Sequence, residues 1–542
     1  MTAESVRPGG LEPTHKPPEV GEVGLKAANL MRMANIGLPI PAWFVLNSGK
    51  CRNYLTEHSL SFDTLEEIKA GVKRLEKETR LVFGDGRKPL LISVRSSAAV
   101  SMPGMMETIL DVGLCDATVQ GLIRMTGNPR FVWDSYRRLI QEYAEVVNNC
   151  DSSHFKSILS QHLAYAEVPS LKDLDASSLK GLAKDYLDEF KAQTGAPFPQ
   201  EPLEQLHGAV RAVFESWESS KAREYRAIQN LRGLAGTAAI VQQMVYGNMG
   251  ATSGSGVAFT RNPATGQNQL YLDFLFNAQG EDLVSGRQSI GSSAGLGMVL
   301  PGVYAEILAL RKRLEMEFKD MQDFEFTIQE GKLYLLQTRS GKRTPWAAIQ
   351  VAADMASEGI IDRTTALKRL KNYDLENVQR RVLSQSARTC EPLSRGVPAS
   401  DGVAVGRIVF DADSALSHRS GQDSGLILVR EAISTEDVSG IASCAGVLTK
   451  TGGKTSHAAV VARQMGKVCV VGCGDMTINL ANKTFDLKGK TLHEEDFISI
   501  DGGTGAVYEG KVQVEFEKPP LLSVVREWKT GEGTDISDGL PS

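Results

Sequence analysis

Cysteine is scarce in this sequence: there are seven in 542 residues, an odd number scattered along the chain. Such a set does not suit the disulfide framework of a secreted domain, so we expect reduced thiols and a cytoplasmic location. Cys469 and Cys473 have a spacing close to that of metal ligands, but no second pair accompanies them. We therefore expect buried thiols there and no zinc site.

Long apolar runs and a strong excess of one charge are also absent. No stretch reaches the roughly 18 apolar residues of a membrane-spanning helix, and the segment before Lys26 has no apolar run of a secretory signal. The net charge of −5 gives no reason to expect nucleic acid or an acidic membrane as a partner. The sequence also contains no internal repeat and no low-complexity block.

What remains is the composition of an ordinary globular protein, with 42% apolar and 23% charged residues. A chain of 542 residues is long enough for about three domains. Residues 127–225 have mainly helical periodicity, whereas short strand-like runs alternate with helices elsewhere. The sequence therefore predicts a multidomain protein of the α/β and α+β classes.

The segment Ala445–Cys473 is the strongest candidate for chemistry. A short strand over Gly446–Thr449, a Gly-Gly turn, a helix over Ala458–Met465 and a second strand over Val468–Val471 are predicted. Thr455 or Ser456 is expected to cap the helix with its hydroxyl. His457 then lies at the helix start, where free N–H groups and the helix dipole favour anions. A neutral imidazole there can act as a nucleophile toward a phosphoryl group.

Two other interpretations of this segment compete with a phosphoryl-accepting histidine. The GGKTS motif suggests a phosphate-binding loop, but that loop needs four residues between its first glycine and its Gly-Lys-Thr. Six residues separate Gly446 from Gly453, so the loop is not predicted. A single histidine at a helix start is more often a capping or packing residue, and only the surrounding sequence favours the catalytic interpretation.

The N-terminal half contains a second set of candidate residues. Lys26 lies at the beginning of a predicted helix, and Arg95 follows the buried strand Leu90–Val94. Ligand sites of α/β proteins form at such strand ends. Small residues follow Arg95 up to the turn at Pro103-Gly104, which would let backbone N–H groups approach a ligand. Alone, this loop is weak evidence for phosphate binding.

Phe324–Thr338 has the alternation of a hairpin. A three-residue loop of Glu330, Gly331 and Lys332 keeps the apolar residues on one face and places Glu325 directly opposite Gln337. Directly opposed side chains have Cβ atoms about 5 Å apart, so a carboxylate and an amide oxygen could share a Mg²⁺ ion. The alternative is a polar cross-strand pair on a wet face.

Besides these local patterns, several long motifs of the sequence resemble those of a known family. TGGKTSHAAVVARQMG resembles the phosphohistidine segment of the phosphoenolpyruvate-utilising enzymes. Residues 24–345 resemble the nucleotide-binding half of pyruvate phosphate dikinase, and the resemblance continues to about residue 513. It implies an ATP-grasp nucleotide-binding domain plus a swivelling phosphohistidine β/β/α domain. Its blocks, in the family's order, are SVRSSAAVSMPGMMETIL, GNPRFVWDSYRRLIQ, VQQMVYGNMG, GVAFTRNPATG, NAQGEDLVSG and DMQDFEFTIQEGKLYLLQTRSGKRT.

The resemblance implies roles for individual residues. His457 would be the catalytic residue, Glu325 and Gln337 the Mg²⁺ ligands, and Thr455 a control phosphorylation site as in plant-type dikinases. His457 would attack the β-phosphorus of ATP and release AMP, and inorganic phosphate, or water in related synthases, would remove the outer phosphoryl group. The implied ATP-binding residues are Lys26, Arg95, Gly104, Gln242, Asp273 and Arg339.

Some positions depart from the family pattern. Thr451 stands where the family usually has Arg, and Lys454 where it usually has an apolar residue, so the cation could have moved by three residues. Asp273 stands where the family has Glu, so a shorter carboxylate occupies this position. Leu25 and Ala27 replace glycines on either side of Lys26.

The sequence pattern also gives the expected domain limits. We expect a loose N-terminus, a nucleotide-binding domain, a helical tail with a linker, a phosphohistidine domain and a disordered tail. The flexible flanks would let the phosphohistidine domain move between sites. The expected limits are 1–21, 22–345, 346–398, 399–512 and 513–542.

Three hypotheses for the whole chain follow. The family continues into a barrel of about 250 residues that binds pyruvate and phosphoenolpyruvate, whereas this sequence ends at Ser542. We favour a dikinase-like enzyme whose pyruvate-binding barrel is a separate chain. A phosphotransferase for another small-molecule acceptor and a non-catalytic nucleotide-binding relic are the alternatives. A homodimer is left open.

Overall fold

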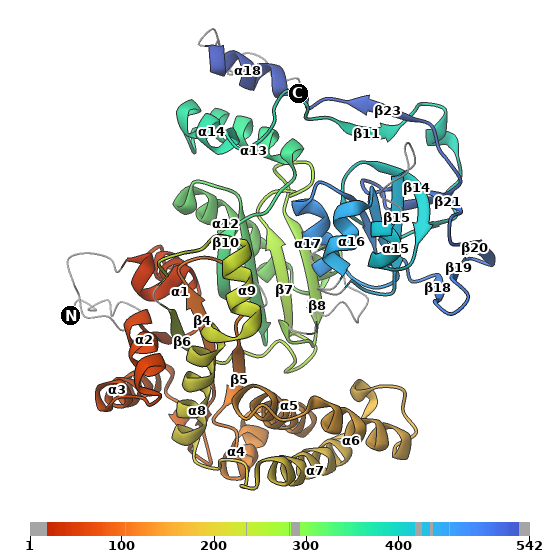
Figure 1. Cartoon of the computed structure of the whole chain (residues 1–542). Coiled ribbons are helices and arrows are strands. Elements are labelled where there is room, and N and C mark those ends of the chain that lie inside the picture. Colours follow the sequence, from red (N-terminus) through yellow and green to blue (C-terminus); the bar gives the residue numbers. More distant parts are fainter. Residues whose placement is uncertain are drawn as a thin grey trace. The chain divides into compact units, whose positions relative to one another are not determined.

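A computed structural model describes residues 19–102, 105–234, 236–280, 282, 293–417, 425–433, 437–454 and 456–530. By their internal contacts the residues form two compact units (Figure 1). The first comprises Met1–Met249 with Tyr334–Gln337, and the second comprises Gly250–Leu333 with Thr338–Ser542. These divisions do not follow the domain limits expected from the sequence, which remain predictions.

The first unit contains a four-stranded antiparallel sheet in the order β1-β6-β4-β5. Its central strands are almost fully buried, as expected for apolar runs that are covered on both faces. A separate two-stranded pair, β2-β3, completes the strands described in this unit. The strands are β1 (Trp43–Leu46), β2 (Val82–Phe83), β3 (Pro89–Leu90), β4 (Ile92–Ala98), β5 (Thr108–Val112) and β6 (Thr237–Gln243).

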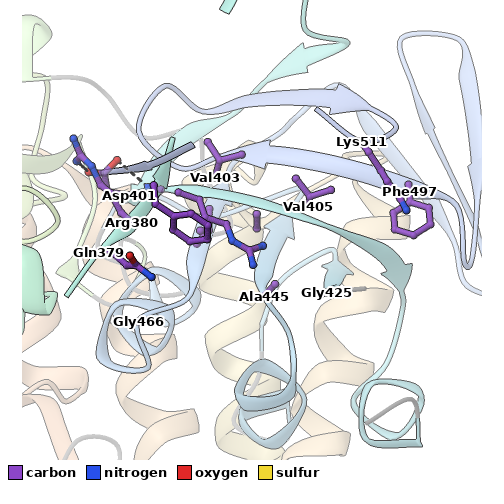
Figure 2. Close-up of a pocket in the computed structure, with 15 residues that line it drawn as sticks. Gln379, Arg380, Asp401, Val403, Val405, Gly425, Ala445, Gly466, Phe497 and Lys511 are labelled. Atoms are coloured by element: carbon purple, nitrogen blue, oxygen red, sulfur yellow. Dashed lines mark hydrogen bonds and ion pairs between the residues drawn. The ribbon is translucent and has the colours of Figure 1, made fainter. Parts of the chain in front are cut away.

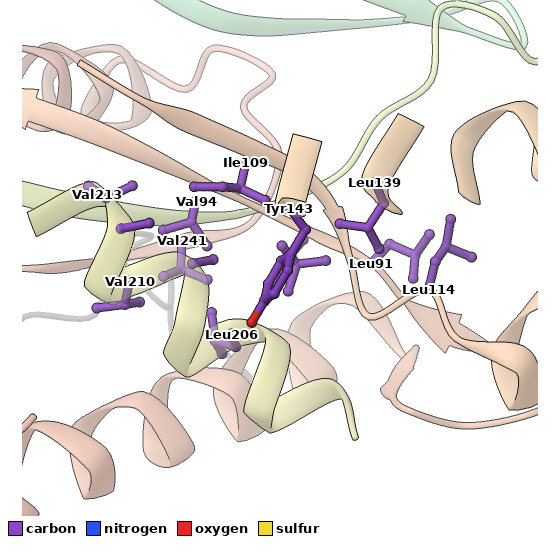
Figure 3. Close-up of a cluster of buried hydrophobic side chains, with 14 of the residues drawn as sticks. Leu91, Val94, Ile109, Leu114, Leu139, Tyr143, Leu206, Val210, Val213 and Val241 are labelled. Atoms are coloured by element: carbon purple, nitrogen blue, oxygen red, sulfur yellow. The ribbon is translucent and has the colours of Figure 1, made fainter. Parts of the chain in front are cut away.

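Helices pack on this sheet and form one continuous core with it. Figure 3 shows Val94 and Ile109 from the strands beside Tyr143, Leu206 and Val210 from the helices, and all five are buried. Several helices begin at an Asn, Asp or Ser whose side chain accepts a backbone N–H. The helices are α1 (Val20–Asn35), α2 (Ser48–Glu57), α3 (Phe62–Thr79), α4 (Asp116–Thr126), α5 (Pro129–Val147), α6 (Ser152–Tyr165), α7 (Ala176–Thr194), α8 (Pro202–Glu215) and α9 (Ser220–Ile228).

The second unit begins with a sheet in the order β10-β9-β7-β8. Arg261, which follows β7 and is fully buried, donates to both carboxylate oxygens of Glu315 at 3.0 and 2.9 Å and also to Glu358. These bonds hold the sheet to two helices. The elements are β7 (Gly254–Phe259), β8 (Tyr271–Phe276), β9 (Gln322–Gln329), β10 (Lys332–Ser340), α11 (Ser293–Val299), α12 (Pro301–Phe318), α13 (Pro345–Ser357) and α14 (Arg363–Leu370).

The rest of the second unit is built on an eight-stranded sheet in the order β12-β22-β21-β14-β15-β16-β17-β13. Strands β14 to β17 run parallel, and α17 lies between β16 and β17 in the chain. The elements are β12 (Ser394–Arg395), β13 (Val397–Ser400), β14 (Val403–Val409), α15 (Ala412–Ser417), β15 (Gly425–Arg430), α16 (Val438–Ser443), β16 (Gly446–Thr449), α17 (His457–Gln464), β17 (Val468–Val471), β18 (Met476–Asn479), β19 (Thr484–Leu487), β20 (Lys490–His493), β21 (Phe497–Asp501) and β22 (Ala506–Glu509).

Two segments expected to be irregular are ordered. Within the expected linker, β11 (Arg380–Leu383) pairs antiparallel with β23 (Val514–Glu517), which lies within the expected disordered tail. The tail then forms α18 (Leu522–Thr530), whose apolar face packs on α13 and α14. The prediction of disorder was therefore wrong for residues 514–530. It rested on the Pro and Gly content of the tail, whereas Leu522, Val525 and Trp528 have the spacing of an apolar helix face and are buried.

Two expectations about composition can be compared with the structure. Within the described ranges, no helix has both the length and the apolar character needed to cross a membrane. All seven cysteines are free, and Cys469 and Cys473 are buried as expected. Burial raises the pKa of the Cys469 thiol to about 12, so it is a packing residue at neutral pH.

Candidate functional site

Arg95, Gln242 and Gln337 lie together in the first unit. The Arg95 guanidinium approaches the side-chain oxygens of Gln242 and Gln337, both at 3.4 Å, and donates to the Leu336 carbonyl oxygen at 3.1 Å. Gln242 is 1% exposed and donates to the Pro41 carbonyl oxygen at 3.3 Å. Three of the residues predicted for nucleotide and metal thus form one connected polar cluster.

The start of α1 places Lys26 at the end of the strand that carries Arg95. Gly24 has a φ of +77°, and a Cβ there would lie 1.9 Å from the Ser97 carbonyl oxygen. Three residues later, the Ala27 N–H donates to the Ser97 hydroxyl at 3.1 Å. Only glycine fits this close approach in the left-handed region. The backbone of Lys26, between these two contacts, is therefore fixed beside β4.

Acidic residues share one face of the second unit's sheet. Directly opposed residues of antiparallel strands point to the same side, and Val257 is opposed by Asp273 in β8 and by Glu325 in β9. Two residues along, Phe259 is opposed by Tyr271 and Asp323, which therefore lie on that face as well. We refer to this side of the sheet as the acidic face.

Asp323 was not predicted from the sequence, although its alternation with Glu325 could have indicated it. It is 4% exposed and accepts from Arg339 Nε at 2.8 Å, whereas its other carboxylate oxygen has no hydrogen-bond partner among the described residues. Burial raises the pKa of the Asp323 carboxyl, and the charge of Arg339 offsets part of that rise. The predicted residue Arg339 is thereby tied to the acidic face.

The hairpin differs from the predicted three-residue loop. β9 ends at Gln329 and β10 begins at Lys332, so only Glu330 and Gly331 form the turn, both with positive φ. At the open end of the hairpin, however, the Gly341 N–H donates to the Met321 carbonyl oxygen. The strand pairing there is displaced by one residue from the pairing that continues from the two-residue turn. One extra residue is therefore accommodated within β10. Glu325 belongs to the second unit and Gln337 to the first, and their opposition stays a prediction.

The segment around His457 forms the predicted strand–turn–helix–strand. α17 begins at His457, and Ser456 occupies the N-cap position. Ser456 is 6% exposed, and its hydroxyl has no hydrogen-bond partner in the described part of the chain, so the expected capping bond from Ser456 does not form. The predicted residues Thr455 and Gly104 and the side chain of His457 lie outside what the structure describes.

Two cations of this segment contact the acidic face. Lys454 Nζ lies 4.7 Å from the centre of the Tyr271 ring, and the Arg463 guanidinium lies 5.2 Å from the Phe259 ring and 5.9 Å from the Tyr271 ring. Arg463 is 1% exposed and donates to the Lys454 carbonyl oxygen at 2.8 Å. Arg463 is desolvated, and cation–π contacts of such groups contribute about 2 kcal/mol. Because Phe259 belongs to β7 and Tyr271 to β8, these contacts hold α17 and the turn before it against β7 and against β8, which carries Asp273.

Comparisons with known proteins agree with this arrangement. Residues 63–290 match the family model described as pyruvate phosphate dikinase, AMP/ATP-binding domain, and residues 422–505 match that of the PEP-utilising enzyme, mobile domain. Over these two segments the chain is similar to pyruvate phosphate dikinase. Its fold is a mixed α/β arrangement of an ATP-grasp nucleotide-binding domain and a phosphohistidine mobile domain, as expected.

Curated proteins similar to this chain are named pyruvate, phosphate dikinase. Over 497 residues the chain is 45% identical to a pyruvate, phosphate dikinase of Clostridium symbiosum, a match that covers 91% of this chain and 57% of that protein. It is 44% identical over 502 residues to pyruvate, phosphate dikinase 2 of Oryza sativa subsp. japonica, and this match covers 92% of this chain and 56% of that protein. A chloroplastic pyruvate, phosphate dikinase of Flaveria pringlei is 44% identical to it over 504 residues, and this match covers 92% of this chain and 52% of that protein. The chain thus spans just over half the length of these relatives.

Within the described residues, no group of three or more His, Cys, Asp and Glu side chains is arranged to hold a metal ion. The oxygen donors of the acidic face nevertheless suit a hard cation, because Asp323 has a buried carboxylate oxygen without a hydrogen-bond partner and Asp273 and Glu325 share its face. A magnesium ion that also takes phosphate oxygens needs only one or two such ligands.

Proposed function

We propose that this chain is an ATP-dependent phosphotransferase that takes phosphoryl groups from ATP onto His457 and releases AMP. The observation that carries the proposal is the contact of the His457 segment with the acidic face, through Lys454 and Arg463. Since Asp273, Glu325 and the Asp323–Arg339 pair share that face, the His457 segment contacts a surface whose other groups are suited to a metal-bound polyphosphate.

The proposed first step is an attack by a neutral imidazole nitrogen of His457 on the β-phosphorus of ATP. A nitrogen–phosphorus bond forms, the bond from the β-phosphorus to the oxygen that bridges to the α-phosphorus breaks, and AMP leaves with that oxygen. At neutral pH most of an imidazole with an ordinary pKa of about 6.5 is uncharged and nucleophilic. The proposed ATP contacts are those predicted from the sequence: Lys26, Arg95, Gly104, Gln242, Asp273 and Arg339.

Magnesium fits this proposal as a cofactor. Glu325 and Gln337 are the proposed ligands, with Asp273 as a further oxygen donor. When bound, the ion would neutralise negative charge on the phosphates and on the departing AMP. The cations nearby would act in the same sense, with Arg339 held in place by Asp323. The hydroxyl of Ser456, which has no hydrogen-bond partner among the described residues, and the first N–H groups of α17 would donate to phosphate oxygens near His457.

The second step and the acceptor are also proposals. Inorganic phosphate, or water, would attack the outer phosphorus of pyrophosphohistidine and leave a phosphohistidine. We propose pyruvate as the final acceptor, because the relatives' names include it.

The identity of the nucleotide product tests the proposal. Purified protein is incubated with ATP and Mg²⁺, with and without inorganic phosphate, and the nucleotides are separated by anion-exchange chromatography. We expect AMP and no ADP. Stimulation by phosphate identifies phosphate as the second nucleophile, whereas equal rates without it favour water. ADP as the main product would contradict the attack on the β-phosphorus.

A further inference from the structure

A large pocket lies in the second unit, at the opposite end of the parallel strands from the His457 segment. It has a volume of about 790 Å³, within the usual range for small-molecule sites. Its floor is formed where the parallel strands begin, at Val403–Val405, Gly425, Ala445 and Val468. The His457 segment instead follows the other end of β16. The pocket is therefore separate from the site described above.

The floor of this pocket is kept low by small residues. At Gly425 a Cβ would lie 2.7 Å from the Val405 carbonyl oxygen, so a larger side chain does not fit the strand there. Ala445 and Gly466 also line the pocket. Figure 2 shows Gly425, Ala445 and Gly466 along one side of the pocket. A flat group could therefore lie close to the backbone.

The walls carry more positive than negative charge. Arg380, Arg381 and Lys511 line the pocket, and Asp401 is the one acidic residue among its lining residues. Asp401 is already ion-paired with Arg380, which also bonds Glu517 at 2.9 Å. The contacts of Arg381 and Lys511 in the described part of the chain are with rings: Arg381 lies 5.6 Å from the centre of Phe516, and Lys511 Nζ lies 3.9 Å from the centre of Phe497. Two cations thus lack an acidic partner there.

We infer that this pocket binds a nucleoside phosphate. The rings of Phe497 and Phe516 and the low floor suit a planar base, because aromatic stacking accepts any base. The cations of Arg381 and Lys511 suit phosphate oxygens. Figure 2 shows Arg380 and Asp401 toward one end of the pocket and Phe497 and Lys511 toward the other. Nothing in the phosphoryl transfer proposed above uses these residues.

The position of the pocket gives such a ligand a second effect. β11 and β23 are the strands that lead into and out of the eight-stranded sheet, and they contribute Arg381 and Phe516. A nucleotide that touches both strands and the sheet floor at once stabilises their pairing. We therefore expect binding to slow backbone amide hydrogen exchange in Arg380–Leu383 and Val514–Glu517.

Photo-crosslinking with labelled 8-azido-ADP on the full chain tests this site. ADP is chosen because it is not the phosphoryl donor of the proposed reaction. Labelled peptides are identified by mass spectrometry, and we expect label in peptides that contain Arg381, Phe497 or Phe516. The double variant Arg381→Glu/Lys511→Glu should reduce that label at least about tenfold, because two charge-assisted contacts with phosphate are replaced by repulsion. Arg395→Glu, an exposed residue of the same sheet outside the pocket lining, should leave it unchanged.

The peptide map keeps this inference distinct from the proposed function. Label in first-unit peptides near Arg95 reports the predicted ATP site, and label in the pocket peptides reports the site inferred here. Absence of label from the pocket peptides, or label that the double charge reversal leaves intact, would overturn the inference. Competition by pyrophosphate as strong as by unlabelled ADP would also overturn it, because a base would then contribute nothing.

Discussion

Gly24→Ala should loosen the start of α1 and weaken ATP binding. The new Cβ would lie 1.9 Å from the Ser97 carbonyl oxygen and 2.4 Å from its hydroxyl. Adopting a positive φ costs alanine about 1–2 kcal/mol, relief of the clash about 1–3 kcal/mol, and loss of the Ala27–Ser97 bond about 1 kcal/mol. The sum is about 4 kcal/mol, and it falls on the turn that holds Lys26.

Gly195→Ala is the matched control for this change. Gly195 has a φ of +75°, against +77° for Gly24, but nothing lies within 4 Å of its Cβ position. Only the backbone penalty of about 1–2 kcal/mol applies there. The difference between the two variants therefore reports the close approach of α1 to β4 together with the ψ of Gly24, which is 164° against −3° for Gly195 and lies in a region that only glycine adopts readily.

Thermal unfolding and nucleotide binding measure the effect. For a unit of this size, 1 kcal/mol corresponds to about 2–4 °C, so we expect Gly24→Ala to lower the midpoint by about 8–16 °C and Gly195→Ala by about 2–8 °C. ATP binding, measured by calorimetry below the melting range, should weaken in Gly24→Ala only. Equal midpoints in the two variants, or unchanged ATP affinity in Gly24→Ala, would refute the reasoning.

Two further substitutions test the proposed chemistry. Glu325→Gln removes one negative charge from the proposed Mg²⁺ site and should lower AMP formation at least about tenfold. Because Glu325 is partly exposed, the melting temperature should change little. Mg²⁺-dependent AMP formation at the wild-type rate would show that the residue is merely structural. Thr455→Asp adds negative charge two residues before His457 and should lower the rate of His457 phosphorylation at least about threefold by repelling ATP. A single-turnover labelling assay measures this rate. An undiminished rate would contradict the electrostatic argument for Thr455 as a control site.

Local pattern predicted part of the site well. The strand, Gly-Gly turn and helix around His457 follow from residues adjacent in sequence, and the structure contains all three. The contact of Arg463 with Phe259 and Tyr271 could not be predicted in this way. A cation on a short helix is ordinarily solvated, and the rings that bury it come from strands far away in the sequence.

The hairpin shows a second limit of pattern reasoning. Alternation correctly predicted two strands, but their turn has two residues with positive φ, a conformation that favours Asn-Gly or Asp-Gly and is unusual for Glu330. The sequence therefore offered no cue for the short turn. The one-residue shift along β10 cannot be read from the sequence either, because the alternation of burial breaks at Gln337 and Thr338, which are both buried although both are polar.

Transfer of label from ATP to His457 tests the central claim most directly. The full chain is incubated with Mg²⁺ and ATP labelled at the β-phosphate, and the protein is digested and mapped. We predict label on His457 that is stable in base and labile in acid, and its loss in His457→Asn, since an amide is too weak a nucleophile. That variant should still bind ATP. Absence of label from the wild-type chain, or label that persists in His457→Asn, would contradict the account.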